Sequence, residues 1–294
     1  MVALGDVTAA LGIEPARLEP TRPGDEESVR NGNWHLWTSD GEHHILRRYH
    51  LLRTAEDLAY ETQVLDHLTA RGWCVPARIA GPIQYDDRLW AATRFVPGTP
   101  HQDETVAQQT ERGEVLARLH ADLSELDLGS RPGFFQAADL DAMGEFQGWD
   151  RGVELLREQR PDLADRAARA MDGAKELVRE YGLLGLPQTI VHGDSASWNL
   201  HFDDDGRLAG VIDFDLCHLD SRVWELVIAR VQPDMLAGYQ RAAAEPLTEH
   251  ELAAIEPLRV VFRVLMVMAE LWNGRQEGRF DEVTIARQLA AARS

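Results

Sequence analysis

Three oxygen-bearing side chains, Asp194, Asn199 and Asp213, lie beside short apolar segments in the second half of the chain. Asn199 follows Asp194 by five positions. The segments 200–203 and 208–212 predict two strands of a hairpin, joined by a turn with the sequence DDDG. If these strands pair, Asn199 and Asp213 lie about 5 Å apart across the strand pair.

A carboxylate and an amide oxygen at that separation suit a hard cation such as Mg²⁺, which prefers oxygen ligands. We expect Asp194 to point into the same space, where two neighbouring carboxylates repel each other unless a cation or a proton joins them. A metal ion is the simplest way to remove this repulsion. For each residue alone the alternative is a turn position, because Asp and Asn often bond the local backbone there.

A second charged pair is predicted in the first hundred residues. Leu58, Glu61 and Leu65 share one face of a predicted helix, so Glu61 lies on an apolar stripe where an ionised carboxylate needs a partner. Arg47, in the strand before this helix, is the predicted partner, and the pair would hold a fixed cation beside a bound ligand. A purely structural salt bridge is the alternative for this pair.

The composition limits the classes of partner. The chain has 294 residues with 30 basic and 49 acidic side chains, a net charge of −19. This balance argues against nucleic acid or an anionic membrane as a partner and favours a cationic one, although solubility alone also explains it. No membrane span is expected, because Arg263 and Glu270 interrupt the longest apolar stretch.

Cysteine and lysine usage exclude further classes. Cys74 and Cys217 are the only cysteines and stand in unrelated contexts, so neither a zinc site nor a disulfide framework is expected. Because the N-terminus also lacks a signal-peptide pattern, we expect a cytoplasmic location. Lys175 is the only lysine, and its surroundings lack the Gly-Lys-Ser/Thr sequence of a Walker A phosphate loop.

Two regions of different character are expected along the chain. The first contains a hairpin over 33–50 with Asp40-Gly41 at its turn, and then a helix over 55–70 that a capping box opens. Beyond the segment PGTP, residues 97–100, helical periodicity dominates apart from the hairpin after Asn199. The predicted domains are therefore 1–97 and 98–294.

Taken in order, these features resemble a known family. They are a strand cation (Arg47), a helix carboxylate (Glu61), the motif H-G-D-x-x-x-x-N at 192–199 and the motif D-F-D at 213–215. The sequence resembles the group of aminoglycoside phosphotransferases, choline kinases and type II homoserine kinases over about residues 25–230. The D-x-x-x-x-N spacing is also that of the protein-kinase catalytic loop.

The resemblance implies an α+β, bilobal, protein-kinase-like fold. Its small N-terminal lobe of sheet plus helix, residues 1–97, would bind nucleotide. Its larger, mainly helical C-terminal lobe, residues 98–294, would carry catalysis and substrate binding. Asp194 would be the catalytic carboxylate, while Asn199 and Asp213 would hold Mg²⁺ that bridges the phosphates of ATP.

The resemblance also implies contacts with the nucleotide. Arg47, braced by Glu61, would contact the α- and β-phosphates. The segment 31–34, which includes Asn33, would form the phosphate-covering turn between the first two strands. The main chain from Arg94 to Val96 would meet the adenine. His192 would brace the catalytic loop, whereas His120 would be a packed histidine at a helix end.

Several positions depart from the family pattern. The family has lysine where this chain has Arg47, and a forked guanidinium has a different geometry toward a carboxylate. The sequence RNGN at 30–33 is poorer in glycine than a kinase loop. Glu225 replaces an aspartate, and Leu219 replaces a glycine. These departures put the fine geometry in doubt, and not the class of reaction.

The function predicted on this basis is ATP-dependent phosphorylation of a hydroxyl group on a small molecule. One hypothesis for the acceptor is an aminoglycoside or another cationic antibiotic, which the acidic composition favours. The second is a metabolic amino alcohol or sugar of the homoserine or choline type. A third hypothesis is a pseudokinase that binds nucleotide without turnover. Acceptor-binding carboxylates are expected within 141–150 or 270–273, and no A-P-E segment of a protein-substrate kinase is found.

Overall fold

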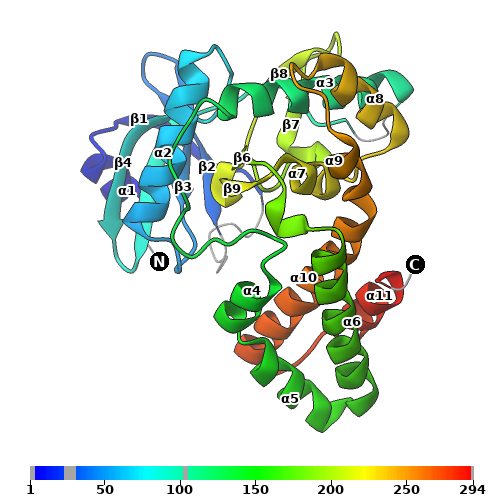
Figure 1. The fold of residues 1–294 in the computed structure, drawn as a ribbon. Helices are drawn as coiled ribbons and strands as arrows, with labels where there is room; N and C mark the ends of the chain where they lie inside the picture. The colour runs from blue at the N-terminus through cyan, green and yellow to red at the C-terminus, as the bar shows by residue number, and fades with distance from the viewer. Residues whose placement is uncertain (1–3, 23–30, 102–104, 293–294) are drawn as a thin grey trace. The chain divides into compact units, whose positions relative to one another are not determined.

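The computed structural model describes residues 4–22, 31–101 and 105–292. The chain forms two compact units, whose elements are labelled in Figure 1. The first unit takes residues 1–104 and 197–217, and the second takes residues 105–196 and 218–294. The hairpin after Asn199 therefore packs with the N-terminal part of the chain. The assignment of nucleotide binding to residues 1–97 and of catalysis to 98–294 stays a prediction.

The first unit is built on a five-stranded antiparallel sheet with the order β1-β2-β3-β5-β4. Its strands are β1 (Pro15–Pro20), β2 (Gly32–Thr38), β3 (His43–Arg48), β4 (Arg78–Tyr85) and β5 (Arg88–Arg94). The hairpin predicted around Asp40-Gly41 is confirmed as β2 and β3, and Gly41 supplies the positive φ of the turn (88°). The edge strand β1 and the short helix α1 (Leu4–Ala10) were not predicted, since neither shows a clear period.

One face of this sheet forms an apolar core with α1. Its buried members are Val7, Trp34, Leu36, Leu46 and Trp90. Successive side chains of a strand point to opposite faces, so Arg47 projects from the face opposite Leu46. Its cross-strand partner on β2 is Asn33, which therefore shares that face.

Helix α2 (Ala55–Ala70) begins and ends as predicted. The Thr54 hydroxyl accepts a hydrogen bond from the N–H of Asp57 (3.1 Å), and the Asp57 carboxylate accepts one from the N–H of Thr54 (3.0 Å). Leu58 and Leu65 are buried on the same face as Glu61, of which only 2% is exposed. The expectation that a carboxylate lies on the buried stripe of this helix is thus confirmed.

The second hairpin of the chain consists of β7 (Leu200–Phe202) and β8 (Leu208–Val211). It joins the first unit through backbone hydrogen bonds: Thr99 and Phe202 exchange two (3.0 and 2.9 Å), and the N–H of Val211 bonds the carbonyl of Cys74 (3.0 Å). Gly210 allows this approach, because a Cβ there would lie 2.6 Å from the Cys74 carbonyl oxygen and would collide with the Val96 side chain. Short 3₁₀ turns flank the hairpin at Ser197–Asn199 and Phe214–Leu216.

The second unit is mainly helical, as predicted. Its helices are α3 (Val106–Leu123), α4 (Leu140–Gln147), α5 (Trp149–Gln159), α6 (Pro161–Glu180), α7 (Arg222–Ile228), α8 (Pro233–Ala242), α9 (Glu249–Ala253), α10 (Ile255–Glu277) and α11 (Glu282–Ala291). A two-stranded antiparallel ribbon, β6 (Gln188–Val191) with β9 (His218–Ser221), lies among them. In the described part of the chain, none of the helices has both the length and the apolar character needed to cross a membrane.

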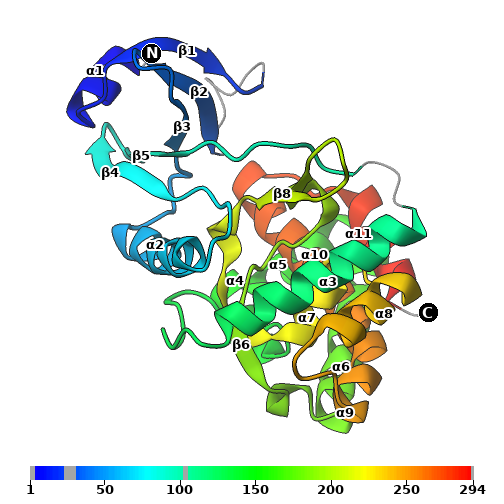
Figure 2. The ribbon, with the colours of Figure 1, turned by 90° about the horizontal axis from the view of Figure 1, so that it is seen from above.

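Helices α3 and α8 lie side by side, as Figures 1 and 2 both show. Gly113 of α3 makes this contact possible, because a Cβ there would collide with the Met235 carbonyl and lie 2.7 Å from the Tyr239 nitrogen. Gly238 of α8 faces Thr110 in the same way. The close packing holds the last turn of α3, which carries His120, against Tyr239.

Candidate active site

The loop after β6 is fixed by one buried carboxylate of the second unit. The N–H of His192 donates to Glu225 Oε2, and the N–H of Gly193 donates to Oε1 and Oε2 of Glu225 (3.2 and 3.3 Å). Gly193 has a φ of 83°, a conformation that glycine adopts without strain. The Ser195 hydroxyl donates to the Glu225 carbonyl (3.2 Å), so α7 holds this loop on both sides of Asp194.

Glu225 keeps its charge although it is completely buried. Burial alone would raise its pKa, but the facing imidazole of His120 and the charge of His192 lower the pKa of Glu225 to about 2. His120 Nε2 lies 3.8 Å from Glu225 Oε2, and its Nδ1 lies 2.8 Å from the Tyr239 hydroxyl. His120 therefore packs at a helix end, as predicted, and in addition faces the carboxylate that holds the loop.

Asp194 combines a fixed backbone with an accessible side chain. Its N–H donates to Nδ1 of the fully buried His192 (3.1 Å), which matches the bracing role predicted for that histidine. The Asp194 side chain itself is half-buried. This arrangement suits a carboxylate that must contact a small ligand in one orientation.

Asn199 and Asp213 flank the two ends of the β7–β8 hairpin in the first unit. Leu200 pairs with Val211, and the N–H of Ile212 donates to the Asn199 carbonyl (2.9 Å). The next residue, Asp213, has a φ of 66°, in the left-handed region where Asp is one of the few tolerated residues. Such backbone strain is common where a side chain must point in a required direction.

Arg47 joins two carboxylates through a single nitrogen atom. Its Nη2 lies 2.9 Å from Asp213 Oδ1 and 2.8 Å from Asp215 Oδ2. Burial alone would lower the pKa of Arg47, but the charges of Asp215 and Asp213 hold it well above its usual value. The guanidinium is thus a fixed cation beside the carboxylate that was predicted to hold a metal.

Asp215 contacts three polar side chains of the first unit. In addition to its ion pair with Arg47, it accepts a hydrogen bond from Asn31 Nδ2 (2.6 Å) and forms an ion pair with Arg53 Nη2 (3.4 Å). The same Arg53 nitrogen donates to the Asp215 carbonyl. Asn31 is itself oriented, because its Oδ1 accepts the N–H of His50 (2.8 Å). Three segments of the first unit therefore meet at this one side chain.

The predicted ion pair between Arg47 and Glu61 is wrong for this structure. Among the described residues the acidic partners of Arg47 are Asp213 and Asp215, and the buried Glu61 Oε2 has no hydrogen-bond partner there. Burial, together with the nearby charge of Asp215, raises the pKa of Glu61 to about 7. Arg47 thus forms its charge-assisted bonds with Asp213 and Asp215, while Glu61 attracts it without an ion-pair contact.

The position predicted for the phosphate-covering turn is also corrected. Asn33 and Trp34 belong to strand β2, and Trp34 is buried in the core of the sheet. Residues 23–30, which precede β2, lie outside the described residues. The resemblance placed 31–34 in that turn, whereas the alternate burial of Gly32–Thr38 assigns all but Asn31 to the strand.

The connector residues have ordinary structural contacts in the first unit. Arg94 ends β5, and its N–H donates to the Ala77 carbonyl (2.8 Å). Val96 is buried against Gly210 of the hairpin. A contact of this segment with adenine stays a prediction.

The oxygen donors at Asn199 and Asp213 fit a hard divalent cation. The Asp213 side chain is 43% exposed, and its carboxylate carries the charge that Mg²⁺ prefers. In the described part of the chain no cluster of three or more His, Cys, Asp or Glu side chains is grouped for a metal. An Asn–Asp pair offers only two protein ligands, so waters and phosphates would supply most of the coordination of Mg²⁺.

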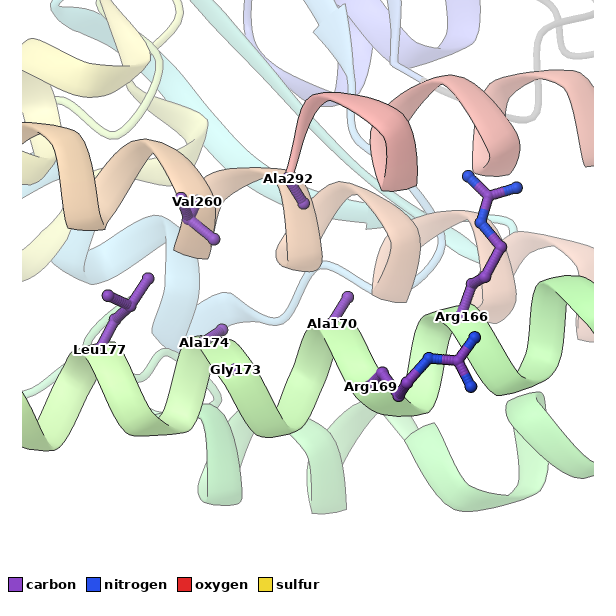
Figure 3. Close-up of a pocket in the computed structure, with 8 residues that line it drawn as sticks. All are labelled: Arg166, Arg169, Ala170, Gly173, Ala174, Leu177, Val260 and Ala292. Carbon is purple, nitrogen blue, oxygen red and sulfur yellow. The ribbon is translucent and has the colours of Figure 1, made fainter. Parts of the chain in front are cut away.

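Two cavities of the second unit are lined by none of the catalytic, metal-binding or nucleotide-binding residues predicted from the sequence. One of about 480 Å³ lies between α6 and α10 and is lined mainly by alanines, Leu177 and Val260, with Arg166 and Arg169 at one end (Figure 3). The other, of about 420 Å³, is lined by residues 130–136 together with Asp139, Gln188 and Leu219. Neither contains Asp194.

Sequence reasoning missed Glu225 as the anchor of the loop and Asp215 as the partner of Arg47. Glu225 had a detectable signal, since it is the only charged residue in the apolar segment 223–228. Such a residue in a short buried helix needs hydrogen-bond donors. For Asp215, Asn31 and Arg53 no local signal exists, because their partners lie far away in the sequence.

Comparisons with known proteins give one family and one fold. The sequence model of the phosphotransferase enzyme family matches residues 23–257. The homoserine kinase of Granulibacter bethesdensis is 29% identical over 254 residues, 80% of this chain and 75% of that protein. The structure of a microcompartment-associated aminopropanol kinase has a TM-score of 0.71 at 18% identity, covering 99% of this chain and 94% of that one. An amicoumacin kinase in complex with AMP-PNP, Ca²⁺ and Ami has a TM-score of 0.70 at 15% identity, covering 99% and 91%.

The chain therefore belongs to the phosphotransferase enzyme family. The predicted resemblance, the phosphotransferase class and the kinase type of reaction are confirmed. The α+β protein-kinase-like fold, with a smaller sheet-containing lobe and a larger helical one, is confirmed as well.

Proposed function

We propose that this phosphotransferase transfers the γ-phosphoryl group of ATP to a hydroxyl group of a small molecule, with Asp194 as the catalytic carboxylate. The observation that carries the proposal is the fixed loop, in which His192 and Gly193 bond Glu225 while the Asp194 side chain stays accessible. A carboxylate held in this way can orient an acceptor hydroxyl and accept its proton. Most of the catalysis in phosphoryl transfer comes from such positioning.

The phosphate side of the reaction is assigned to the first unit. Asn199 and Asp213 would hold Mg²⁺, which neutralises phosphate charge when it is bound. Arg47 would supply a permanent positive charge to the α- and β-phosphates. Asn33 shares the face of Arg47 and remains a proposed nucleotide contact, as does the main chain of Arg94 and Val96 with adenine.

The acceptor that we propose is a small amino alcohol or hydroxy amino acid. Two relatives support it, one named for homoserine and one for aminopropanol, because both molecules carry an amine and a hydroxyl. The net charge of −19 suits a cationic acceptor. In the second unit burial and the nearby charges of Asp281 and Glu277 raise the pKa of Glu270. Asp141 instead forms an ion pair with Lys175 at 2.5 Å, which neutralises its charge. We therefore favour 270–273 over 141–150 for the acceptor amine.

A cationic antibiotic is the second candidate acceptor. The supporting observation is the likeness of the fold to an amicoumacin kinase, over 99% of this chain. In that case the protein would confer antibiotic resistance. The same acidic composition would serve a larger cationic acceptor equally well.

The test measures ADP release with MgATP and a panel of acceptors: homoserine, aminopropanol and choline against aminoglycosides and amicoumacin. Asp194→Asn should lower turnover by about 100-fold or more, because it removes the proton acceptor. Asp203→Asn, in the exposed turn of the hairpin, is the matched control and should keep the wild-type rate. Wild-type turnover by Asp194→Asn would refute the assignment of this carboxylate. Nucleotide-induced thermal stabilisation without ADP release for any acceptor would instead support a pseudokinase.

A further inference from the structure

Glu61 lacks the partner that the family resemblance gives it, and Arg47 is held elsewhere. We propose that Asp215, and not Glu61, is the positioning residue that holds Arg47 for the phosphates of the nucleotide. This inference rests on the proposed function, since it assigns a counter-ion to the cation of that same site. All residues involved belong to the first unit.

The first argument is the geometry around Arg47. Its Nη2 lies 2.8 Å from Asp215 Oδ2, and both side chains are only 11% exposed. A charge-assisted hydrogen bond between two largely buried groups is strong, and the loss of one partner is costly. Exposed ion pairs contribute much less, because water screens them.

The second argument separates Asp215 from Asp213. Asp213 also bonds Arg47, but 43% of its side chain is exposed and its carboxylate is the proposed metal ligand. A bound cation would compete with Arg47 for Asp213. Asp215 keeps its position independently of Arg47, because Asn31 and Arg53 hold it from two other segments. It is therefore the carboxylate that remains available to Arg47 when a metal–nucleotide complex binds.

The third argument concerns Glu61 itself. Its Oε2 is buried and makes no hydrogen bond within the described residues, and no ion pair joins it to Arg47. The raised pKa of Glu61, caused by burial and by the charge of Asp215, leaves this carboxyl partly protonated near neutral pH. A partly protonated group without a bond to the guanidinium cannot fix its direction.

The experiment is a double-mutant cycle read by the dissociation constant of MgADP, measured by titration calorimetry. Arg47→Met and Asp215→Asn should each weaken MgADP by at least about tenfold, and the double variant should bind no more weakly than Arg47→Met alone. Glu61→Gln should change the dissociation constant by less than about threefold. Asp205→Asn, an exposed turn residue paired with Arg207, is the control for the removal of a negative charge.

A second variant covers the case in which Asp215→Asn does not fold. Asn31→Ala removes the 2.6 Å bond that orients Asp215, together with the acceptor of the His50 N–H. It should weaken the binding of MgADP by about threefold in the wild-type background but not in Arg47→Met. A role in folding alone would lower the melting temperature in both backgrounds, without this dependence on Arg47.

Three results would overturn the inference. One is tight MgADP binding by Asp215→Asn, and another is an equal further loss when Asp215→Asn is added to Arg47→Met, which would make Asp215 act independently of Arg47. The third is a loss in Glu61→Gln as large as that in Arg47→Met. If the wild-type protein binds MgADP and only the dissociation constants of these variants differ from expectation, this inference fails while the proposed function stands. If the wild-type protein binds no MgADP, both fail.

Discussion

Replacement of Glu225 by Gln tests the anchor of the catalytic loop most directly. The two side chains have nearly the same shape, so the substitution removes a charge without leaving a cavity. Glu225 accepts the N–H groups of His192 and Gly193. A Gln side chain has one acceptor oxygen, and its amide nitrogen would face one of these donors. We therefore expect the loop around Asp194 to lose part of its order.

The expected loss of stability follows from the pKa of Glu225. Burial opposes its charge, yet the facing His120 and the nearby His192 lower the pKa from 4.5 to about 2. At about 1.4 kcal/mol for each tenfold change in the ionisation constant, this lowering corresponds to about 3 kcal/mol of stability. Because the folded-state pKa is depressed, this contribution is present above pH 4.5 and is lost as the pH falls toward 2. The free energy of unfolding of Glu225→Gln should thus be about 3 kcal/mol lower than that of the wild-type protein at pH 7, and this difference should shrink below pH 4.5.

Urea unfolding of the wild-type protein and of Glu225→Gln at pH 7 and pH 3.5 measures both values. Glu270→Gln is the matched control in the same unit, because burial and two acidic neighbours raise the pKa of Glu270. That variant should not lose stability at pH 7. Turnover of Glu225→Gln should fall by at least about tenfold, since Asp194 depends on the position of the loop. A loss of less than about 1 kcal/mol at pH 7 would refute the role of Glu225 as an anchor.

Three other predictions concern the first unit. Because the pKa of Glu61 is raised to about 7, its ionisation lowers the stability of the fold as the pH rises from 4.5 to 7. The melting temperature of Glu61→Gln should therefore be higher than that of the wild-type protein at pH 8, but not at pH 4. Gly210→Ala should lower the free energy of unfolding by about 1–3 kcal/mol in calorimetry, because its Cβ would lie 2.6 Å from the Cys74 carbonyl oxygen. Gly185→Ala is the control, since a Cβ there has open space, and an equal loss in both variants would contradict the packing argument. Arg47→Met should bind Mn²⁺ alone at least about fivefold more tightly by electron paramagnetic resonance, because it frees Asp213, and unchanged binding would speak against this competition.

Features that depend on a few adjacent residues were predicted correctly from the sequence. The turn at Asp40-Gly41 and the cap at Thr54 are determined by local backbone chemistry, and both lie where they were expected. The burial of Glu61 followed from helical spacing alone. The pairing of the second hairpin followed from its alternation of apolar residues and its turn.

Features that depend on competition between distant groups were not predictable. Spacing indicated that Glu61 needs a partner and that Arg47 lies on the preceding strand, but it could not rank Glu61 against Asp213 and Asp215 for the same guanidinium. That ranking depends on the burial and the orientation of each side chain. Local sequence cannot encode them for Arg47 and Asp213, which are separated by 166 positions in the chain. The position of the turn at 31–34 was implied by the resemblance alone, whereas the alternating pattern from Asn33 onward already predicted a strand.

Glu225 and Glu61 show how the same side chain acquires opposite properties in one protein. Both are almost completely buried, so burial raises the pKa of each. Glu225 receives backbone N–H groups and faces His120, and its pKa falls to about 2. Glu61 has one oxygen without a hydrogen-bond partner in the described chain and a second carboxylate nearby, and its pKa rises to about 7. Only Glu225 is therefore a permanent anion at neutral pH, and a permanent anion is what a fixed catalytic loop requires. The cation Arg47 likewise needs a permanent anion to hold it. In the first unit Asp215 is such an anion, since it bonds Arg47 directly, and Glu61 is not.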